Sequence, residues 1–170
     1  KIVNRDTVLF LSGGSTPKLL YAQLAKEGKI KLGAIALVDE RFGEPFHLNS
    51  NEKMIQETGL PSYLSENDIF YYPILQKGKD RKTAALEYDK VVGSLFSRFS
   101  KRVAILGIGE DGHTAGIAPN ITFPKHLFVS EFNDKKGSFG QRITLTFEAL
   151  SKMSLLLILV FGENKKDALR

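Results

Sequence analysis

Residues 7–17 read TVLFLSGGSTP, an apolar run followed by two glycines, two hydroxyl side chains and a proline. The apolar run predicts a buried strand, and the glycines predict a tight turn after it. Thr16 at the cap position and Pro17 at the first helical position predict a helix that begins there and continues to Lys26. Gly28 then ends this helix. The stretch is therefore typical of a strand–turn–helix unit in an α/β protein.

The same alternation continues along the chain. Residues 34–38, 103–106 and 155–161 are further apolar runs, and each predicts a buried strand. The expected helices are 51–56 and 83–96, with helical turns over 164–170, and the remaining expected strands are 69–73, 127–129 and 142–147. Apolar strands separated by helices indicate a Rossmann-like three-layer α/β/α fold, with a mostly parallel sheet that is covered on both faces.

Three of these strands run directly into polar or glycine-rich segments. The segments are SGGST at 12–16, DER at 39–41 and GIGEDGH at 107–113. Ligands of such sheets bind beyond the carboxyl ends of the strands. We therefore expect the three segments to meet at one edge of the sheet and to form a single site there.

The composition excludes several classes of protein. The chain has 170 residues, a net charge of +5 and no cysteine. A disulfide scaffold, a thiolate metal site and a cysteine nucleophile are therefore excluded. The longest apolar run, 155–161, is too short to cross a bilayer, so we expect no membrane partner. The basic residues are scattered rather than grouped, which argues against a nucleic-acid partner.

The ends and the length of the chain lead to further expectations. No signal-peptide pattern opens the sequence, and the lack of cysteine fits a reducing compartment, so we expect a cytoplasmic protein. We expect one domain over residues 1–170, trimmed at both ends, because the first residue is Lys1 and residues 164–170 read as the start of a longer helix. A monomer or a small homo-oligomer is expected.

The first polar segment has the character of an anion site. Gly13 and Gly14 allow a ligand to approach the backbone closely, and Ser15 and Thr16 add hydroxyl groups at the start of a helix. The alternative is a plain tight turn with a good helix cap. A Walker phosphate loop is excluded because the chain has no G-x-x-x-x-G-K-[ST] motif.

The third polar segment contains a literal G-x-G-x-x-G at 107–112, with Glu131 downstream, so a dinucleotide site must be considered. Two features count against it. Pro119 comes too soon for a full helix after the last glycine. Glu110 and Asp111 also place negative charge where a pyrophosphate would approach. We therefore expect no cofactor.

His113 closes this segment and is the candidate general base, because imidazole exchanges protons near neutral pH. Asp111 is close enough in sequence to orient the ring, and Gly109 adds backbone donors nearby. The alternative is a structural histidine. His47 and His126 lack such a setting and are expected at the surface. No metal site is expected, because the three histidines are far apart and no H-E-x-x-H motif is present.

Several charged residues are candidates for binding an anionic sugar. Arg41 offers a planar fork of donors, and Asp39 can accept hydrogen bonds from hydroxyl groups. Arg142 and Lys165 are further candidate cations. For each of them the alternative is a solvated side chain or a weak surface ion pair. A serine-hydrolase mechanism has no support, because the chain has no G-x-S-x-G motif.

Taken together, these segments resemble the 6-phosphogluconolactonase family, which is related to the glucosamine-6-phosphate deaminases. The similar segments occur in the family's order: LSGGSTP at 11–17, DER at 39–41 followed by Ser50 and Asn51, GIGEDGHTA at 107–115, RITLT at 142–146 and GENK at 162–165. The stretches 42–49 and 119–136 carry little of the family's pattern.

The resemblance implies hydrolysis of 6-phospho-D-glucono-1,5-lactone to 6-phosphogluconate, in the oxidative pentose phosphate pathway and without a cofactor. It implies that His113 activates water, and that the phosphate or the sugar is surrounded by Ser15, Thr16, Arg41, Arg142 and Lys165. Two alternatives stay open: a glucosamine-6-phosphate deaminase and a non-catalytic domain that binds a sugar phosphate. The deaminases have a glutamate shortly after the histidine, whereas residues 114–119 here read TAGIAP.

Overall fold

A five-stranded parallel sheet forms the centre of the molecule in a computed structural model that describes residues 3–119, 121–134 and 140–169. The strand order is β4-β2-β1-β5-β8, and every neighbouring pair is parallel. The bounds are β1 Thr7–Leu11, β2 Ala34–Leu37, β4 Phe70–Tyr72, β5 Lys101–Gly107 and β8 Leu155–Leu159. The strands β1 and β2 are buried along their whole length, as their continuous apolar sequences predict.

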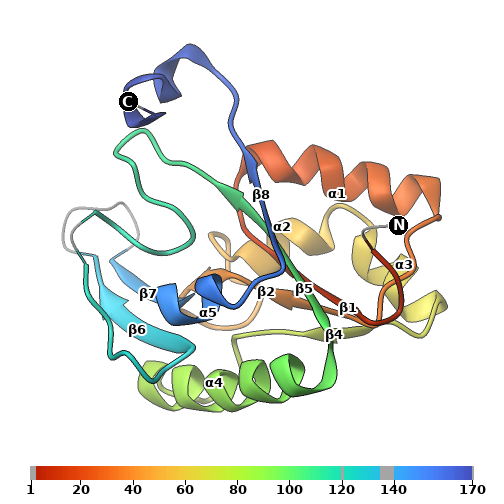
Figure 1. The fold of residues 1–170 in the computed structure, drawn as a ribbon, viewed down its shortest axis with the longest axis horizontal. Coiled ribbons are helices and arrows are strands. Elements are labelled where there is room, and N and C mark those ends of the chain that lie inside the picture. The colour runs from red at the N-terminus through yellow and green to blue at the C-terminus, as the bar shows by residue number, and fades with distance from the viewer. Residues whose placement is uncertain (1–2, 120, 135–139, 170) are drawn as a thin grey trace.

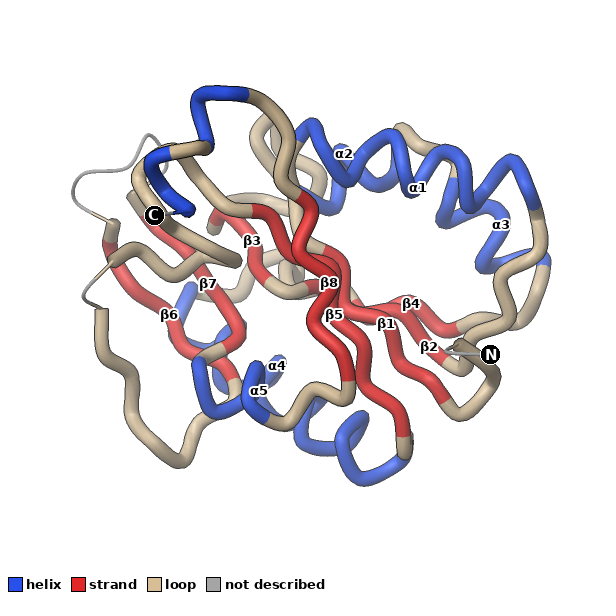
Figure 2. The backbone as a smooth tube through the Cα atoms, turned by 45° about the horizontal axis from the view of Figure 1, so that its top comes forward, coloured by secondary structure: helices blue, strands red, loops and turns tan. Residues whose placement is uncertain are grey.

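Helices cover the two faces of this sheet (Figures 1 and 2). On one face lie α1 Ser15–Glu27, α2 Asn51–Gln56 and α3 Leu60–Glu66, and on the other lie α4 Arg81–Arg98 and the short α5 Phe147–Ser151. The expected three-layer α/β/α arrangement is therefore confirmed. None of the described helices combines the length and the apolar character that a membrane span requires.

A second, antiparallel sheet stands beside the first and was not expected. Its order is β3-β7-β6, with β3 Asp39–Arg41, β6 Val129–Asn133 and β7 Gln141–Leu145. The segment 39–41 was expected to follow the end of a strand, and it is itself a strand. After β2 the chain continues as a new strand paired with β7, so that Asp39 and Glu40 are buried rather than solvated.

Local signals placed most helices correctly, with differences at their ends. Gly28 ends α1 in the left-handed conformation, as expected. The cap of α4 is Asp80, whose side chain accepts a hydrogen bond from the Thr83 backbone, so this helix begins before the predicted residue 83. Helix α3 was not predicted. Its seven residues are too few to show a clear helical period.

Strand β8 differs from the expectation that the run 155–161 is covered on both faces. It lies at the edge of the sheet, and Leu155 to Ile158 are 39 to 51% exposed. The apolar run predicts a strand correctly, but it does not show how well that strand is covered. Beyond β8 the chain forms two short 3-10 turns, η1 Glu163–Lys165 and η2 Asp167–Leu169, where helical turns were expected.

Two acidic side chains are buried where β3 meets α2. Glu40 is fully buried, and Glu52 in the first turn of α2 is 5% exposed. Burial, and secondly the negative charge of Glu40, raise the pKa of Glu52 from its ordinary 4.5 to about 7. The folded protein therefore holds a proton on Glu52 at pH values at which the unfolded chain has released it.

This raised pKa predicts the effect of Glu52→Gln on stability. Because the folded state binds more protons than the unfolded state between pH 4.5 and about 7, wild-type stability falls as the pH rises through this window. Glutamine does not titrate, so its stability lacks this loss. The free energy of unfolding of the variant, relative to that of the wild type, should therefore rise by roughly 1–2 kcal/mol between about pH 5 and about pH 8. Urea unfolding at several pH values measures this difference.

The matched control for this measurement is Glu66→Gln, which removes an exposed carboxyl group from α3. Its stability relative to the wild type should stay constant over the same pH range. A Glu52→Gln difference that is also constant with pH would contradict the prediction.

Candidate active site

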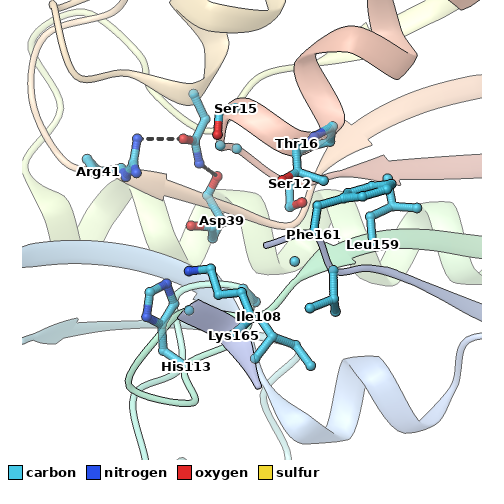
Figure 3. A pocket seen from close by; sticks show the side chains of 18 of the residues that line it. Ser12, Ser15, Thr16, Asp39, Arg41, Ile108, His113, Leu159, Phe161 and Lys165 are labelled. Atoms are coloured by element: carbon cyan, nitrogen blue, oxygen red, sulfur yellow. Dashed lines mark hydrogen bonds between the residues drawn. The ribbon is translucent and has the colours of Figure 1, made fainter. Parts of the chain in front are cut away.

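The three polar segments at the strand ends lie together around one open cavity of about 200 Å³ (Figure 3). This is below the roughly 300–1,000 Å³ of pockets for drug-sized ligands, and it suits a small polar molecule. Of the candidate residues, Gly13, Gly14, Ser15, Thr16, Asp39, Arg41, Gly109, His113, Arg142 and Lys165 all line it. Asp111 does not line the cavity, but it contacts His113 from behind.

The loop after β1 places the start of α1 at the cavity. Gly14 caps the helix with φ 106° and ψ 164°, a conformation open only to glycine. The helix therefore begins at Ser15, and the prediction that Thr16 caps it is wrong. No side chain among the described residues caps this helix, so its first N–H groups are open to an anion. The buried Ser12 Oγ, which also lines the cavity, has no hydrogen-bond partner in the described part of the chain.

In the loop after β5, one oxygen of Asp111 contacts both the ring and the backbone of His113. Asp111 Oδ1 lies 2.6 Å from His113 Nδ1 and accepts a second bond from the His113 backbone N–H at 3.2 Å. Since a carboxylate only accepts, this contact fits a hydrogen on Nδ1, and in the neutral ring that tautomer leaves the lone pair on Nε2. Partial burial raises the pKa of Asp111, but its hydrogen bonds from His113 outweigh this and hold that pKa below its usual value.

Gly109 makes room for this histidine. A Cβ atom at position 109 would lie 2.1 Å from His113 Nδ1 and 2.6 Å from Asp111 Oδ1, far inside contact distance. The Gly109 backbone N–H also donates to the His113 carbonyl at 2.7 Å, which closes the loop as a tight turn. No helix follows this turn in residues 113–119 and 121–128, so the G-x-G-x-x-G motif lacks the strand–turn–helix geometry of a dinucleotide site.

Arg41 is oriented by a neighbour that was not among the predicted site residues. Its Nη1 donates to Asn51 Oδ1 at 2.7 Å and to the Asn49 carbonyl at 3.0 Å. Asn51 Nδ2 donates in turn to the Asp39 carbonyl at 2.9 Å, and Figure 3 shows the two bonds of the Asn51 side chain as dashed lines. Gly13 leaves the space for this amide, since a Cβ there would lie 1.8 Å from Asn51 Oδ1.

Asp39 and Arg142 both line the cavity and are both largely buried. Arg142 Nη1 lies 4.0 Å from Asp39 Oδ2, and Arg142 Nε lies 3.8 Å from Asp134 Oδ2. Burial raises the pKa of the Asp39 carboxyl group, while the positive charges of Arg41 and Arg142 oppose that rise. Arg142 is thus a buried partner of carboxylates as well as a lining residue.

Lys165 reaches the cavity from η1, near the end of the chain. Its Nζ lies 3.9 Å from Glu110 Oε1, and Asn164 Nδ2 also donates to this carboxylate. In Figure 3 Lys165 and His113 lie on the opposite side of the cavity from Arg41 and Asp39. Cations therefore stand on both sides of the space in front of the histidine.

Sequence reasoning missed several residues of the lining. Ser12 and Asn51 were part of the quoted segments but were not singled out, and following those segments residue by residue would have found them. No sequence motif marked the apolar part of the cavity wall, which consists of Ile108, Ala115 and Leu159 to Phe161. Neither His47 nor His126 lines the cavity. His47 contacts the Arg41 carbonyl through Nε2 at 2.9 Å, and His126 is exposed. Among the described residues no group of three His, Asp or Glu is placed to hold a metal ion.

Comparisons with known proteins show which family this chain resembles. The family model described as glucosamine-6-phosphate isomerases/6-phosphogluconolactonase matches residues 3–170. A 6-phosphogluconolactonase of Rhizobium meliloti is 30% identical over 171 residues, which are 95% of this chain and 71% of that protein. A 6-phosphogluconolactonase of Xylella fastidiosa is 32% identical over 174 residues, covering 95% of this chain and 69% of the relative.

Solved structures show the same similarity in three dimensions. A 6-phosphogluconolactonase from Thermotoga maritima superposes with a TM-score of 0.76 at 28% identity, covering 99% of this chain and 75% of that one. One from Shewanella baltica gives a TM-score of 0.78 at 27% identity, covering 96% of this chain and 71% of that one. With a family model that spans nearly the whole sequence, the chain belongs to the glucosamine-6-phosphate isomerase/6-phosphogluconolactonase family.

Proposed function

We propose that the protein hydrolyses 6-phospho-D-glucono-1,5-lactone to 6-phosphogluconate, with His113 as the general base. The observation that carries the proposal is a histidine whose Nδ1 is bound to Asp111 while its ring borders a cavity lined by Arg41, Arg142 and Lys165. The names of the curated relatives support the same reaction. A base facing a cationic cavity suits an anionic ester substrate.

In the proposed reaction His113 Nε2 takes a proton from a water molecule, and the water oxygen attacks the lactone carbonyl carbon. The negative charge that develops on the carbonyl oxygen is stabilised by the Lys165 ammonium group. The bond from this carbon to the ring oxygen then breaks, and the imidazolium returns its proton to that oxygen. The atoms of one water molecule are thereby added across the ester bond, and the histidine is regenerated.

The phosphate group is proposed to bind at the start of α1, near Arg41. The open N–H groups of this helix, the hydroxyl groups of Ser12 and Ser15 and the Arg41 guanidinium all suit a phosphate with its several acceptor oxygens. Binding the phosphate away from the reacting carbon places the lactone against His113. The lactone's hydroxyl groups would then face Asp39.

The deaminase alternative has less support. Residues 114–119, which follow the histidine, contain no carboxylate that could assist ring opening of an amino sugar. An assay of ammonia release from glucosamine 6-phosphate separates the two reactions, and we expect no activity in it. A non-catalytic sugar-phosphate domain would show neither reaction.

Replacing the proposed base tests the reaction directly. His113→Ala should lower the enzymatic hydrolysis of the lactone by roughly 10²–10⁴-fold, because proton transfer to the base is lost. The rate is measured by rapid trapping of the remaining lactone, with the spontaneous ring opening subtracted. His126→Ala, at an exposed histidine outside the cavity, is the control and should keep full activity. Unchanged turnover in the His113 variant would refute the assignment.

Adding a methyl group behind the histidine tests its placement. Gly109→Ala forces the His113 ring away from Asp111, since the new Cβ would overlap both side chains. We expect kcat to fall by roughly 10²-fold, as for a misplaced catalytic group, with little change in KM. Gly93→Ala in α4 is the matched control, because its Cβ would meet Phe128 at an ordinary 3.8 Å. An active Gly109→Ala enzyme would show that the ring position is unimportant.

Arg41→Ala tests the phosphate site. We expect the KM for the phosphorylated lactone and the Kd of 6-phosphogluconate each to rise by roughly 10- to 100-fold, because a charge-assisted pair of bonds to phosphate is lost. The kcat should change much less, since Arg41 is proposed to bind a group remote from the reacting carbon. Steady-state kinetics and calorimetric titration give these values. A variant with unchanged KM but a reduced kcat would place Arg41 at the reacting carbon instead.

A further inference from the structure

Glu40 lies between two residues of the cavity without reaching the cavity itself. Successive side chains of a strand point to opposite faces, so Asp39 and Arg41 of β3 share one face and Glu40 takes the other. Glu40 is fully buried there. An acidic side chain is seldom buried completely unless its charge is compensated by hydrogen bonds or by an opposite charge.

Four donors converge on the Glu40 carboxylate. The backbone N–H groups of Arg41 and Asn51 donate to Oε1 at 2.8 and 2.7 Å. The Glu52 backbone N–H and the Ser50 hydroxyl donate to Oε2 at 2.9 and 3.1 Å. Burial raises the pKa of Glu40, and the backbone hydrogen bonds oppose this. With both oxygens occupied by donors, the geometry fits the ionised carboxylate.

The segment held by Glu40 is the one that orients Arg41. Residues 50–52 donate three of the four bonds, and the Arg41 guanidinium donates to Asn51 Oδ1 and to the neighbouring Asn49 carbonyl. Hydrogen bonds therefore connect the Glu40 carboxylate to residues 50–52. Further hydrogen bonds connect residues 49 and 51 to the guanidinium of Arg41, which follows Glu40 in the strand.

A role of Glu40 as the cap of helix α2 does not account for its four hydrogen bonds. Helix α2 already has a cap, since Ser50 Oγ accepts from the Lys53 backbone N–H at 3.1 Å. Glu40 instead fixes the position of the whole turn that precedes α2. The Asn51 side chain, wedged against Gly13 and bonded to Asp39, transmits that position to the cavity wall.

We propose that Glu40 is a positioning residue for the phosphate group of the substrate: its buried carboxylate clamps residues 50–52 so that Asn49 and Asn51 hold the Arg41 guanidinium in its binding direction. This inference rests on the proposed function for the identity of the substrate. Its central claim, that Glu40 acts through Arg41, can be measured by anion binding alone.

The experiment replaces Glu40 by glutamine, which keeps the shape but puts an NH₂ group where an acceptor is needed. Glu40→Gln should raise the KM for the phosphorylated lactone and the Kd of inorganic phosphate by roughly 10-fold each, with kcat within about twofold of the wild type. Glu52→Gln is the matched control. It changes a buried carboxyl group in the same turn, whose Oε2 makes no hydrogen bond within the described part of the chain, and both constants should stay unchanged.

A double-mutant cycle with Arg41→Ala distinguishes positioning from general damage. If Glu40 acts through Arg41, Glu40→Gln should have no further effect on phosphate affinity once Arg41 is removed. An equal loss in both backgrounds, or a fall in kcat without a change in KM, would overturn the proposal. If the glutamine variant does not fold, Glu40→Asp keeps the charge, withdraws it by one methylene group and should give the same pattern.

The two proposals can fail separately. If the wild type hydrolyses no lactone, the proposed function is wrong, while the phosphate titrations of the Glu40 variants still test the positioning role. If the wild type is an active lactonase and the Glu40 variants bind phosphate normally, only the positioning role is wrong.

Discussion

In a parallel sheet every crossover returns the chain to the same end, so the carboxyl ends of β1, β2 and β5 lie along one edge. This constraint brings together three segments that are far apart in the sequence. It places the start of α1 next to the first residues of β3 and opposite the loop that carries His113. The positions of the remaining site residues follow from this one directional rule.

Burial of charge is the second determinant of the site. Asp39 and Glu40 are adjacent, buried and compensated in different ways, Asp39 mainly by the arginines and Glu40 by backbone N–H groups. Removing two carboxylates from water is costly unless such partners are fixed in place. The same partners are therefore held rigidly, and this suits a site that must bind a substrate in one orientation.

Much of this arrangement was predictable from the sequence, because its signals are local. The apolar runs gave the strands of the central sheet, Gly28 gave the end of α1, and the glycine-rich segments pointed to the cavity. The second sheet was only partly predictable. The expected strand 142–147 corresponds to β7, and the expected strand 127–129 overlaps β6 at Val129, but β3 has three charged residues and is a strand only through its pairing with β7. The apolar wall of Leu159 to Phe161 also depends on tertiary contacts that no local pattern encodes. The exposure of β8 likewise depends on what packs against it and not on its own residues.

Gly13 and Gly109 each occupy a place where a neighbouring side chain fills the space of a Cβ atom, in one case the amide of Asn51 and in the other the ring of His113. Every missense change in either codon introduces a residue with a Cβ atom. Both residues stand in loops at the rim, outside the hydrophobic core, so the polypeptide can still fold and accumulate. Under the proposed function, alleles altered at these codons would lower activity rather than the amount of protein, and an assay of abundance would not reveal them.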